Sequence, residues 1–189
     1  MLSLAKANIP TLLIVDMQKC MTKEAGHRNN PFAEANIARL LRRWRESGAT
    51  VVHVRHMSRT AGSPFWPGQI GAEFQDDFEP LPSEHIVEKH IPDAFAHSGL
   101  ERWLRVRNID SLVIVGVSTN NSVESTARSS GNLGFLTLVV SDATFAFDKM
   151  DYSGSPREAE IVHAMSLANL NGEYATIVAT DEALKLTAA

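Results

Sequence analysis

Three residues that can move protons or attack a carbonyl group follow short apolar runs of the chain. Asp16 ends the run Thr-Leu-Leu-Ile-Val-Asp at 11–16, and Lys89 directly follows the brief strand expected at 86–88. Ser122 comes shortly after the almost wholly apolar residues 111–117. A buried aspartate costs free energy unless it is paired or solvated in a cleft. An acid, an amine and a hydroxyl that meet in one cleft could support proton transfer and nucleophilic attack.

The polar turn Ser-Thr-Asn-Asn-Ser at 118–122 separates an expected strand from a helix marked by Val123 and Ala127. The first amides of a helix lack intrahelical partners and carry the positive end of its dipole. They could hold a developing oxyanion beside the Ser122 hydroxyl. In the simpler alternative these five residues only cap the helix. The residues alone favour that simpler alternative.

Uniformly apolar strands alternate with amphipathic helices along the chain, which predicts a parallel sheet covered by helices on both faces. The carboxyl ends of parallel strands meet at one edge, where open α/β sheets bind ligands. We therefore expect Asp16, Lys89 and Ser122 to converge there. The expected strands are 11–16, 50–54, 86–88, 111–117, 135–140 and 175–179, and helices begin at Pro31, Leu100, Val123, Pro156 and Thr180.

Composition and charge restrict the class of protein. The 189 residues, 44% hydrophobic and 21% charged, predict a single globular domain over 1–189. A net charge of -4 without a basic stripe argues against nucleic-acid binding. Cys20 is the only cysteine, which excludes an intramolecular disulfide and zinc sites of the CxxC type. The N-terminal residues resemble neither a signal peptide nor a membrane span, so we expect a cytoplasmic protein without a membrane partner.

Two further segments are candidates for the wall of a pocket. Residues 57–84 lack periodicity, and a loop this long in a compact domain is usually functional. Its aromatic residues, among them Phe65 and Trp66, suit a pocket or a subunit contact, although the loop could pack for its own sake. His53, Arg55 and His56 lie near the end of the second strand. A lone histidine there is more often structural than a ligand.

Several motifs together resemble the isochorismatase-like hydrolases, also called the cysteine hydrolase family. They are Leu-Leu-Ile-Val-Asp-Met-Gln (12–18), Val-Glu-Lys (87–89), Gly-Val-Ser-Thr-Asn-Asn-Ser-Val-Glu-Ser-Thr-Ala-Arg (116–128), Gly-Asn-Leu-Gly-Phe (131–135) and Val-Ser-Asp-Ala-Thr (140–144). The match runs from about Pro10 to Glu182. The resemblance implies a three-layer, Rossmann-like α/β fold with a mainly parallel six-stranded sheet. It also implies a homo-oligomer, a dimer or tetramer, whose subunits often help to complete the sites.

The resemblance also implies a catalytic triad. Asp16 corresponds to the proton carrier and Lys89 to the residue that steadies the charges, whereas Ser122 occupies the position of the family's nucleophilic cysteine. A cis peptide bond is expected between Val117 and Ser118. The amides of Ser118 and Ser122 would form the oxyanion hole.

Serine at the nucleophile position departs from the family pattern, and Cys20 lies elsewhere in the sequence. A serine hydroxyl is a weaker nucleophile than a thiol and normally needs a well-aligned general base. Three explanations stay open. Ser122 is an engineered replacement that traps substrate, or a natural serine that is slow or idle. Alternatively, the mechanism needs no nucleophile, because Asp16 protonates a vinyl ether and water attacks.

The second departure concerns metal. Nicotinamidase-like members bind a metal through an Asp-x-His pair after the second strand, but here 51–58 is Val-Val-His-Val-Arg-His-Met-Ser. We therefore predict no catalytic metal and no other cofactor, and we disfavour nicotinamide as the substrate.

The resulting hypothesis is a small-molecule hydrolase that cleaves a C–N bond in a compact amide, imide or ureido compound. The alternatives are a nucleophile-free vinyl-ether hydrolase and a non-catalytic protein that binds a small molecule in the same pocket. Weaker candidates for substrate binding are Gln18, Arg55, Trp66, Asn120 and Phe147.

Overall fold

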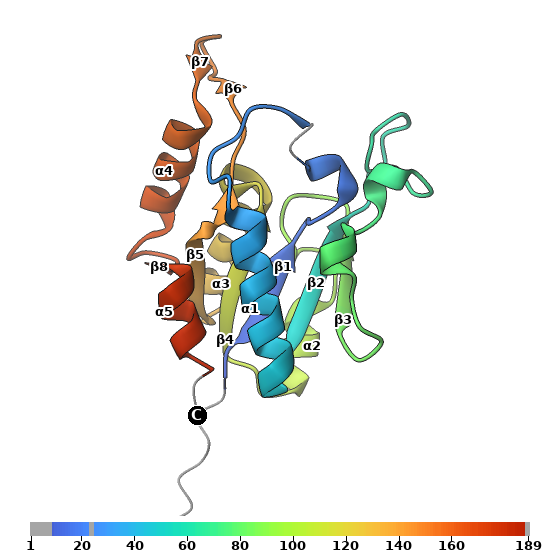
Figure 1. Ribbon diagram of the computed structural model, residues 1–189, viewed down its shortest axis with the longest axis vertical. Helices are drawn as coiled ribbons and strands as arrows, with labels where there is room; N and C mark the ends of the chain where they lie inside the picture. The colour runs from blue at the N-terminus through green and yellow to red at the C-terminus, as the bar shows by residue number, and fades with distance from the viewer. Residues whose placement is uncertain (1–8, 23–24, 188–189) are drawn as a thin grey trace, which may run out of the picture.

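The protein is built on a six-stranded sheet with the strand order β3-β2-β1-β4-β5-β8, in a computed structural model that describes residues 9–22 and 25–187 (Figure 1). Every pair of neighbouring strands in this sheet is parallel. The expected mainly parallel six-stranded sheet is therefore confirmed. The strands are β1 (Thr11–Val15), β2 (Val51–His56), β3 (His85–Lys89), β4 (Ser111–Val117), β5 (Leu136–Phe145) and β8 (Thr176–Val178).

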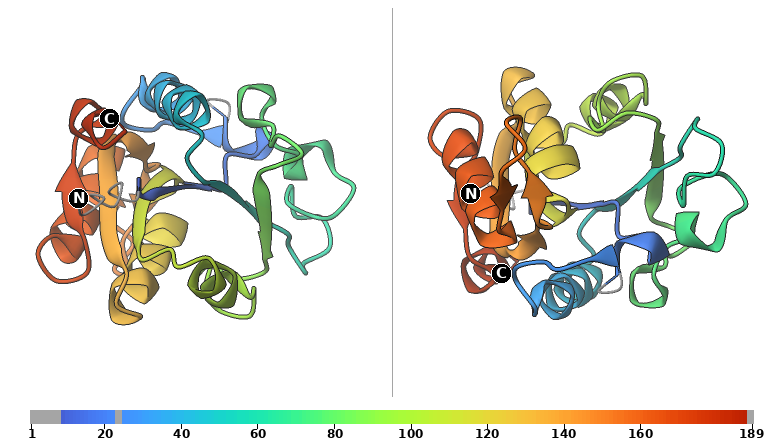
Figure 2. Two further views of the ribbon diagram at one scale, coloured as in Figure 1. Left: turned by 90° about the horizontal axis from the view of Figure 1, so that it is seen from below. Right: turned by 90° about the horizontal axis from the view of Figure 1, so that it is seen from above.

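Helices cover both faces of the sheet (Figure 2). Helices α1 (Ala33–Ser47) and α5 (Thr180–Lys185) pack on one face, and α2 (Leu100–Val106), α3 (Glu124–Asn132) and α4 (Ala159–Leu170) pack on the other. In β1, Leu12 and Ile14 contribute to the core under α1, whereas Leu13 and Val15 contribute to the core under α2 and α3. Burial on both faces explains why the strand is continuously apolar.

Three strands extend further than the sequence pattern predicts. Strand β2 continues to His56, and β3 runs from His85 to Lys89. Strand β5 also continues past residue 140, after an irregularity in its pairing with β4 between Ile114 and Gly116. Several residues at these strand ends are polar, so a pattern based on hydrophobicity places the ends of the strands too early. The longer β2 places His56 at the end of a strand rather than in a loop.

The predicted starts of two helices are wrong. Helix α1 begins at Ala33 rather than Pro31, and the Asn30 side chain donates hydrogen bonds to the carbonyl oxygens of Ser141 and Thr144, at 2.8 and 2.7 Å. Pro156 belongs to a two-stranded hairpin, and α4 begins only at Ala159.

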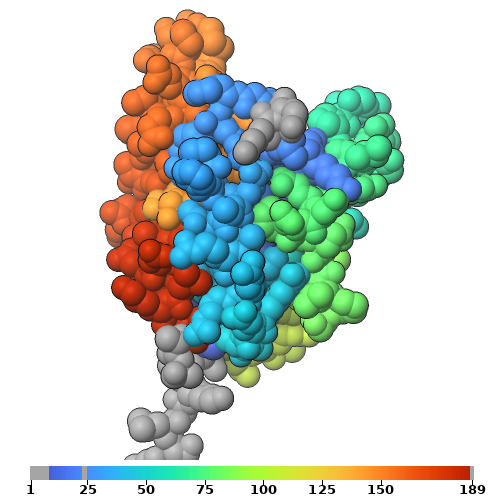
Figure 3. All heavy atoms as spheres, viewed as in Figure 1, coloured from blue at the N-terminus to red at the C-terminus, as the bar shows by residue number. Residues whose placement is uncertain are grey.

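That hairpin is formed by β6 (Lys149–Met150) and β7 (Pro156–Arg157), and the sequence pattern predicts neither strand. Strands of two residues are too short to produce a recognisable alternation. The loop 57–84 likewise contains two 3₁₀ turns, η3 (Ile70–Ala72) and η4 (Asp76–Phe78). The orange hairpin forms the upper end of the molecule in Figure 3, and the teal part of the loop projects at the upper right.

Gly116 allows β4 to pass close to the end of β1. Its φ is +118°, and a Cβ atom at this position would lie 2.1 Å from the Val15 carbonyl oxygen. Only glycine fits such an approach in this conformation. The contact lies beside Asp16, the next residue after Val15, and so fixes the distance between two neighbouring strand ends.

Candidate active site

Asp16, Lys89 and Ser122 meet at the carboxyl edge of the sheet. They come from the end of β1, the end of β3 and the turn after β4. Lys89 Nζ donates to Asp16 Oδ2 at 2.7 Å and to Ser122 Oγ at 3.1 Å. The three residues are only 4%, 1% and 6% exposed, respectively. The structure thus brings together the acid, the amine and the hydroxyl in one buried cluster.

Asp16 leaves the strand in the left-handed conformation, with φ of +52°. Aspartate tolerates this region better than most residues. Burial raises the pKa of its carboxyl group, although attraction to Lys89 acts in the opposite direction. Its Oδ1 atom is buried and accepts no hydrogen bond from the residues that the structure describes. A carboxyl group with a raised pKa and a free oxygen is suited to exchanging a proton with a bound molecule.

Ser122 lies in the turn η5 (Thr119–Val123), which has the wide geometry of a π-helix. The Val123 N–H donates to the Ser118 carbonyl oxygen, five residues back, at 3.2 Å. The peptide bond between Val117 and Ser118 is cis, at the position that the resemblance implies. Short π-helical segments occur often at functional sites. The polar residues of the turn make no side-chain cap at its start, so the simple capping role does not describe them.

Helix α4 holds this turn from the side. Thr119 Oγ1 and His163 Nδ1 lie 2.9 Å apart, and the Ser166 hydroxyl donates to the Thr119 carbonyl oxygen at 2.9 Å. All three residues are buried. Ser166 also donates to Glu124 at the start of α3, at 2.6 Å. These contacts anchor the backbone that carries Ser122.

A small cavity of about 140 Å³ opens over the cluster. Its lining is mixed, because it combines the polar side chains of Asp16 and Ser122 with apolar side chains such as that of Phe65. The complete lining is Asp16, Met21, His56, Phe65, Pro92, Val117, Ser118, Asn121 and Ser122. Since cavities for drug-sized ligands are usually about 300–1,000 Å³, this one suits a compact molecule.

A second, more open cavity of about 360 Å³ adjoins the first and shares Ser118 and Asn121 with it. Two of the predicted substrate-binding residues, Asn120 and Phe147, line this second cavity. The hairpin strand β6 contributes Lys149.

The other predicted substrate-binding residues do not line either cavity. Gln18 is buried, and its Nε2 atom donates to the carbonyl oxygens of His56 and Ala72, at 2.9 and 2.8 Å. Arg55 pairs with Glu88, and Trp66 is partly exposed in its loop. Gln18 thus supports the site from beneath.

For four residues of the small cavity, the sequence gives only a weak indication of a place in the pocket or none at all. His56 and Phe65 stood out as a histidine at a strand end and an aromatic side chain in a long loop, and both do line the small cavity. Met21 and Pro92 gave no signal, because their places depend on how separate loops fold over the edge. His53, in contrast, is structural, since its Nε2 atom lies 2.8 Å from the Glu84 carboxylate.

The only cysteine lies apart from this cluster. Cys20 is in the 3₁₀ turn η1 (Lys19–Met21) and does not line the small cavity. Burial raises the pKa of its thiol to about 12. The thiol is therefore protonated at neutral pH, which makes Cys20 a poor substitute for Ser122 as a nucleophile.

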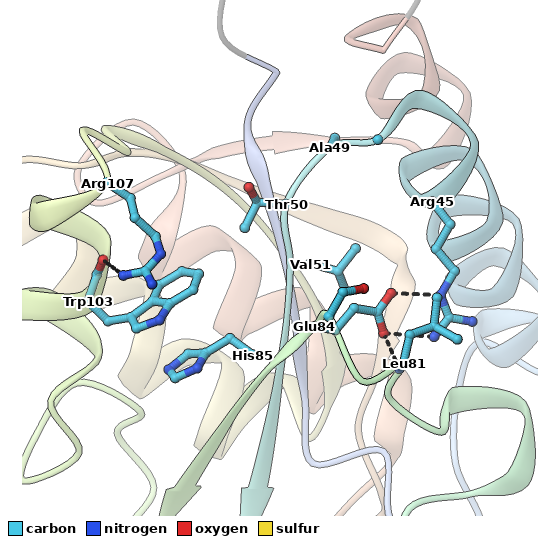
Figure 4. Close-up of a pocket in the computed structure, with 11 residues that line it drawn as sticks. Arg45, Ala49, Thr50, Val51, Leu81, Glu84, His85, Trp103 and Arg107 are labelled. Carbon is cyan, nitrogen blue, oxygen red and sulfur yellow. Dashed lines mark hydrogen bonds and ion pairs between the residues drawn. The ribbon is translucent and has the colours of Figure 1, made fainter.

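Another cavity, of about 350 Å³, lies at the opposite, amino edge of the sheet (Figure 4). Its polar groups are already paired with one another. The Arg45 guanidinium group donates to the Glu84 carboxylate at 2.7 and 2.8 Å. The Trp103 ring stacks on His85 at 4.1 Å, and the Arg107 guanidinium group lies 4.1 Å from the centre of the same ring. Open α/β sheets bind ligands at the other edge, so size alone does not make this cavity the functional site.

Two further findings concern metals and membranes. Within 9–22 and 25–187, no group of three or more His, Cys, Asp and Glu side chains is arranged to hold a metal ion. No helix in these two ranges has both the length and the apolar character needed to cross a lipid bilayer.

Comparison with known proteins identifies relatives over nearly the whole chain. The isochorismatase domain family matches residues 10–182. An uncharacterized isochorismatase family protein of Bacillus subtilis, YrdC, is 41% identical over 90% of this chain and 92% of its own length. The ureidoacrylate amidohydrolase RutB of Variovorax paradoxus is 29% identical over 73% of this chain and 69% of its own.

A solved structure has the same fold as this chain over almost its whole length. It is the crystal structure of a putative hydrolase of the isochorismatase family from Chromobacterium violaceum, 43% identical to this chain. The two superpose with a TM-score of 0.93 over 97% of this chain and 95% of the other. A domain match from residue 10 to residue 182, together with relatives above 40% identity, shows that this chain belongs to the isochorismatase family of hydrolases.

Proposed function

We propose that the protein hydrolyses a C–N bond in a compact amide, imide or ureido compound. The observation that carries this proposal is the position of Lys89 Nζ, within hydrogen-bond distance of both Asp16 and Ser122 below a cavity of about 140 Å³. A relative named as a ureidoacrylate amidohydrolase supports the choice of bond.

In the proposed mechanism Ser122 Oγ attacks the carbonyl carbon of the substrate while its proton passes to Asp16. The new oxyanion accepts hydrogen bonds from the amides of Ser118 and Ser122. Asp16 then gives the proton to the departing nitrogen as the C–N bond breaks, which leaves an ester on Ser122. Water attacks this ester, and Asp16 carries the water's proton back to Ser122 Oγ. The Lys89 ammonium group stabilises the negative charges throughout.

The serine at position 122 determines how fast we expect the protein to hydrolyse an amide. The family resemblance puts a cysteine at position 122, and a carboxylate is a poor base for an alcohol even when its pKa is raised. We therefore expect slow turnover by Ser122 and faster turnover by Ser122→Cys. Asp16 needs to exchange protons in either form, so Asp16→Asn should inactivate both.

The test is a screen of small amides, imides and ureido compounds for released ammonia, with the wild-type protein, Ser122→Cys and Ser122→Ala in parallel. Turnover by wild type or by Ser122→Cys, with none by Ser122→Ala, supports the proposal. Activity in the cysteine form alone indicates that the serine disables the enzyme or traps its substrate. No turnover by any form across the screen would contradict the amidase function and favour a protein that only binds small molecules.

A vinyl-ether hydrolase is the second candidate. The free Oδ1 atom of Asp16, which has no partner in the described part of the chain, favours it because that reaction needs a proton donor and water but no nucleophile. Such an enzyme should keep its activity in Ser122→Ala and lose it in Asp16→Asn. An amidase that uses Ser122 would lose activity in both variants.

A further inference from the structure

The strand order places a fourth polar side chain in line with the cluster. Four neighbouring strands, β3, β2, β1 and β4, end respectively at Lys89, at His56, next to Asp16 and shortly before Ser122. His56 is the register partner of Lys89 in the β2–β3 pair. It also lines the small cavity together with Asp16 and Ser122.

Both backbone polar groups of His56 are held by one side chain. The buried Gln18 side chain accepts a hydrogen bond from the His56 N–H at 2.8 Å and donates one to its carbonyl oxygen at 2.9 Å. The imidazole ring meets Phe65 edge to face, with ring centres 5.2 Å apart. A side chain held in this way is preorganised, which reduces the entropy lost when it binds a ligand.

The imidazole ring has hydrogen-bonding capacity to spare. Neither of its ring nitrogens is bonded to any side chain or backbone group that the structure describes. Burial and the nearby Lys89 ammonium group lower the pKa of His56, with a smaller contribution from His90, while Asp16 acts in the opposite direction. The ring is therefore neutral near pH 7 and offers one N–H donor and one nitrogen acceptor.

We infer that His56 binds the substrate directly and donates a hydrogen bond to a second oxygen beside the scissile amide. This inference rests on the proposed function and narrows it. Imides and N-acylureas carry such an oxygen, whereas simple alkyl amides and plain ureas do not. A site that is built to bond a polar group discriminates against analogues that lack it, because its own polar group is left unpaired. His56 would thus select acylureas and imides over alkyl amides of the same size.

A binding measurement tests the contact without any turnover. Acetylurea and pentanamide have similar chain lengths, but only acetylurea has the second carbonyl oxygen. Each is titrated into wild-type protein with ¹³C-labelled histidine, and the His56 NMR signal is identified by its absence in His56→Gln. Acetylurea should shift the His56 signal, pentanamide should shift it less, and the His85 signal at the opposite edge should stay in place. A His56 signal that does not respond to acetylurea would overturn the inference.

A kinetic measurement tests the selectivity. The ratio of kcat/KM for acetylurea over pentanamide is compared in the more active of the wild-type and Ser122→Cys backgrounds. Loss of one hydrogen bond in His56→Leu should lower the ratio roughly tenfold. His56→Gln, which keeps a donor, should restore part of it, and His85→Leu is the matched control that should leave it unchanged. A ratio that His56→Leu does not alter would overturn the inference.

These experiments distinguish a failure of the proposed function from a failure of the inference about His56. If neither background hydrolyses any amide, the proposed function fails, while the NMR titration still decides whether His56 contacts acetylurea. If amides are hydrolysed but the His56 variants keep the wild-type selectivity, the proposed function stands and the inference about His56 fails.

Discussion

Lys89 Nζ lies 3.1 Å from Ser122 Oγ and so connects β3 to the turn after β4, across the two strands β2 and β1 that separate them in the sheet. The same nitrogen atom bonds Asp16 at 2.7 Å. One buried ammonium group thus holds both the Asp16 carboxylate and the Ser122 hydroxyl.

Lys89→Met should abolish amide hydrolysis and destabilise the protein. Breaking a buried ion pair by removing one partner typically costs about 3–5 kcal/mol, because the other charge is left uncompensated. Urea denaturation at pH 7 measures this change in the free energy of unfolding. The double variant Asp16→Asn with Lys89→Met removes both charges and should be more stable than Lys89→Met alone. Equal stability of the single and double variants would show that the pair does not act as a unit.

Thr119→Val tests whether α4 positions the turn that carries Ser122. The change removes the hydroxyl that lies 2.9 Å from His163 Nδ1, which should cost about 1 kcal/mol and also lower kcat, because the turn that carries Ser122 loosens. The matched control is Thr137→Val. Its buried hydroxyl lies 2.6 Å from Ser130 Oγ, outside both cavities of the site, so the control should lose similar stability and keep its kcat. Equal effects on kcat in both variants would argue against a positioning role.

Glu84→Gln should change how the free energy of unfolding depends on pH. Burial opposes ionisation of Glu84, but hydrogen bonds from Arg45, the Leu81 N–H and His53 outweigh it and lower the pKa to about 2. A carboxyl group whose pKa is lower in the folded state stabilises the protein above its unfolded value of 4.5, and this stabilisation is lost as the pH falls towards 2.

Urea denaturation between pH 7 and pH 2 should therefore find Glu84→Gln less stable than wild type at pH 7, by a margin that shrinks below pH 4.5. Glu79→Gln, a change in the same loop, controls for the loss of one negative charge. A margin that stays constant down to pH 2 would contradict the assignment of the Arg45–Glu84–His53 network.

The homo-oligomer implied by the resemblance stays a prediction. Helix α4 turns His163 and Ser166 inward but leaves Ile161 and Met165 more than half exposed, at 54% and 58%. Exposed apolar side chains on one helix face suit a contact with a second copy. Light scattering should then give a mass at least twice the 20.7 kDa of one chain, and Met165→Lys should lower it. A wild-type mass of one chain would refute the prediction.

The fold and the central cluster were accessible from the sequence because both depend on strongly patterned elements. The apolar strands before Asp16 and Ser122 and the strand that carries Lys89 could be recognised, and parallel strands end at one edge. The position of His56 was harder to predict, because the last residues of β2 are polar and do not continue the apolar pattern of the strand. Its strand end became evident only from the register with β3.

The substrate pocket was much less accessible. Gln18 follows β1 and Arg55 lies near the end of β2, yet Gln18 supports the backbone of His56 and Arg55 pairs with Glu88. Met21 and Pro92 line the cavity because two loops fold over the same edge, which no local pattern encodes. Lining residues from irregular segments depend on tertiary packing, and propensity does not predict them.

In the proposed mechanism, residue 122 forms a covalent bond to the substrate while Lys89 and Asp16 support it. The most direct test is the intact mass of Ser122→Cys, quenched in acid during turnover of an amide found in the screen, followed by peptide mapping. We expect an added mass equal to the acyl group, located at position 122 and absent from the double variant Asp16→Asn with Ser122→Cys. Turnover without any adduct, or an adduct on Cys20, would contradict it.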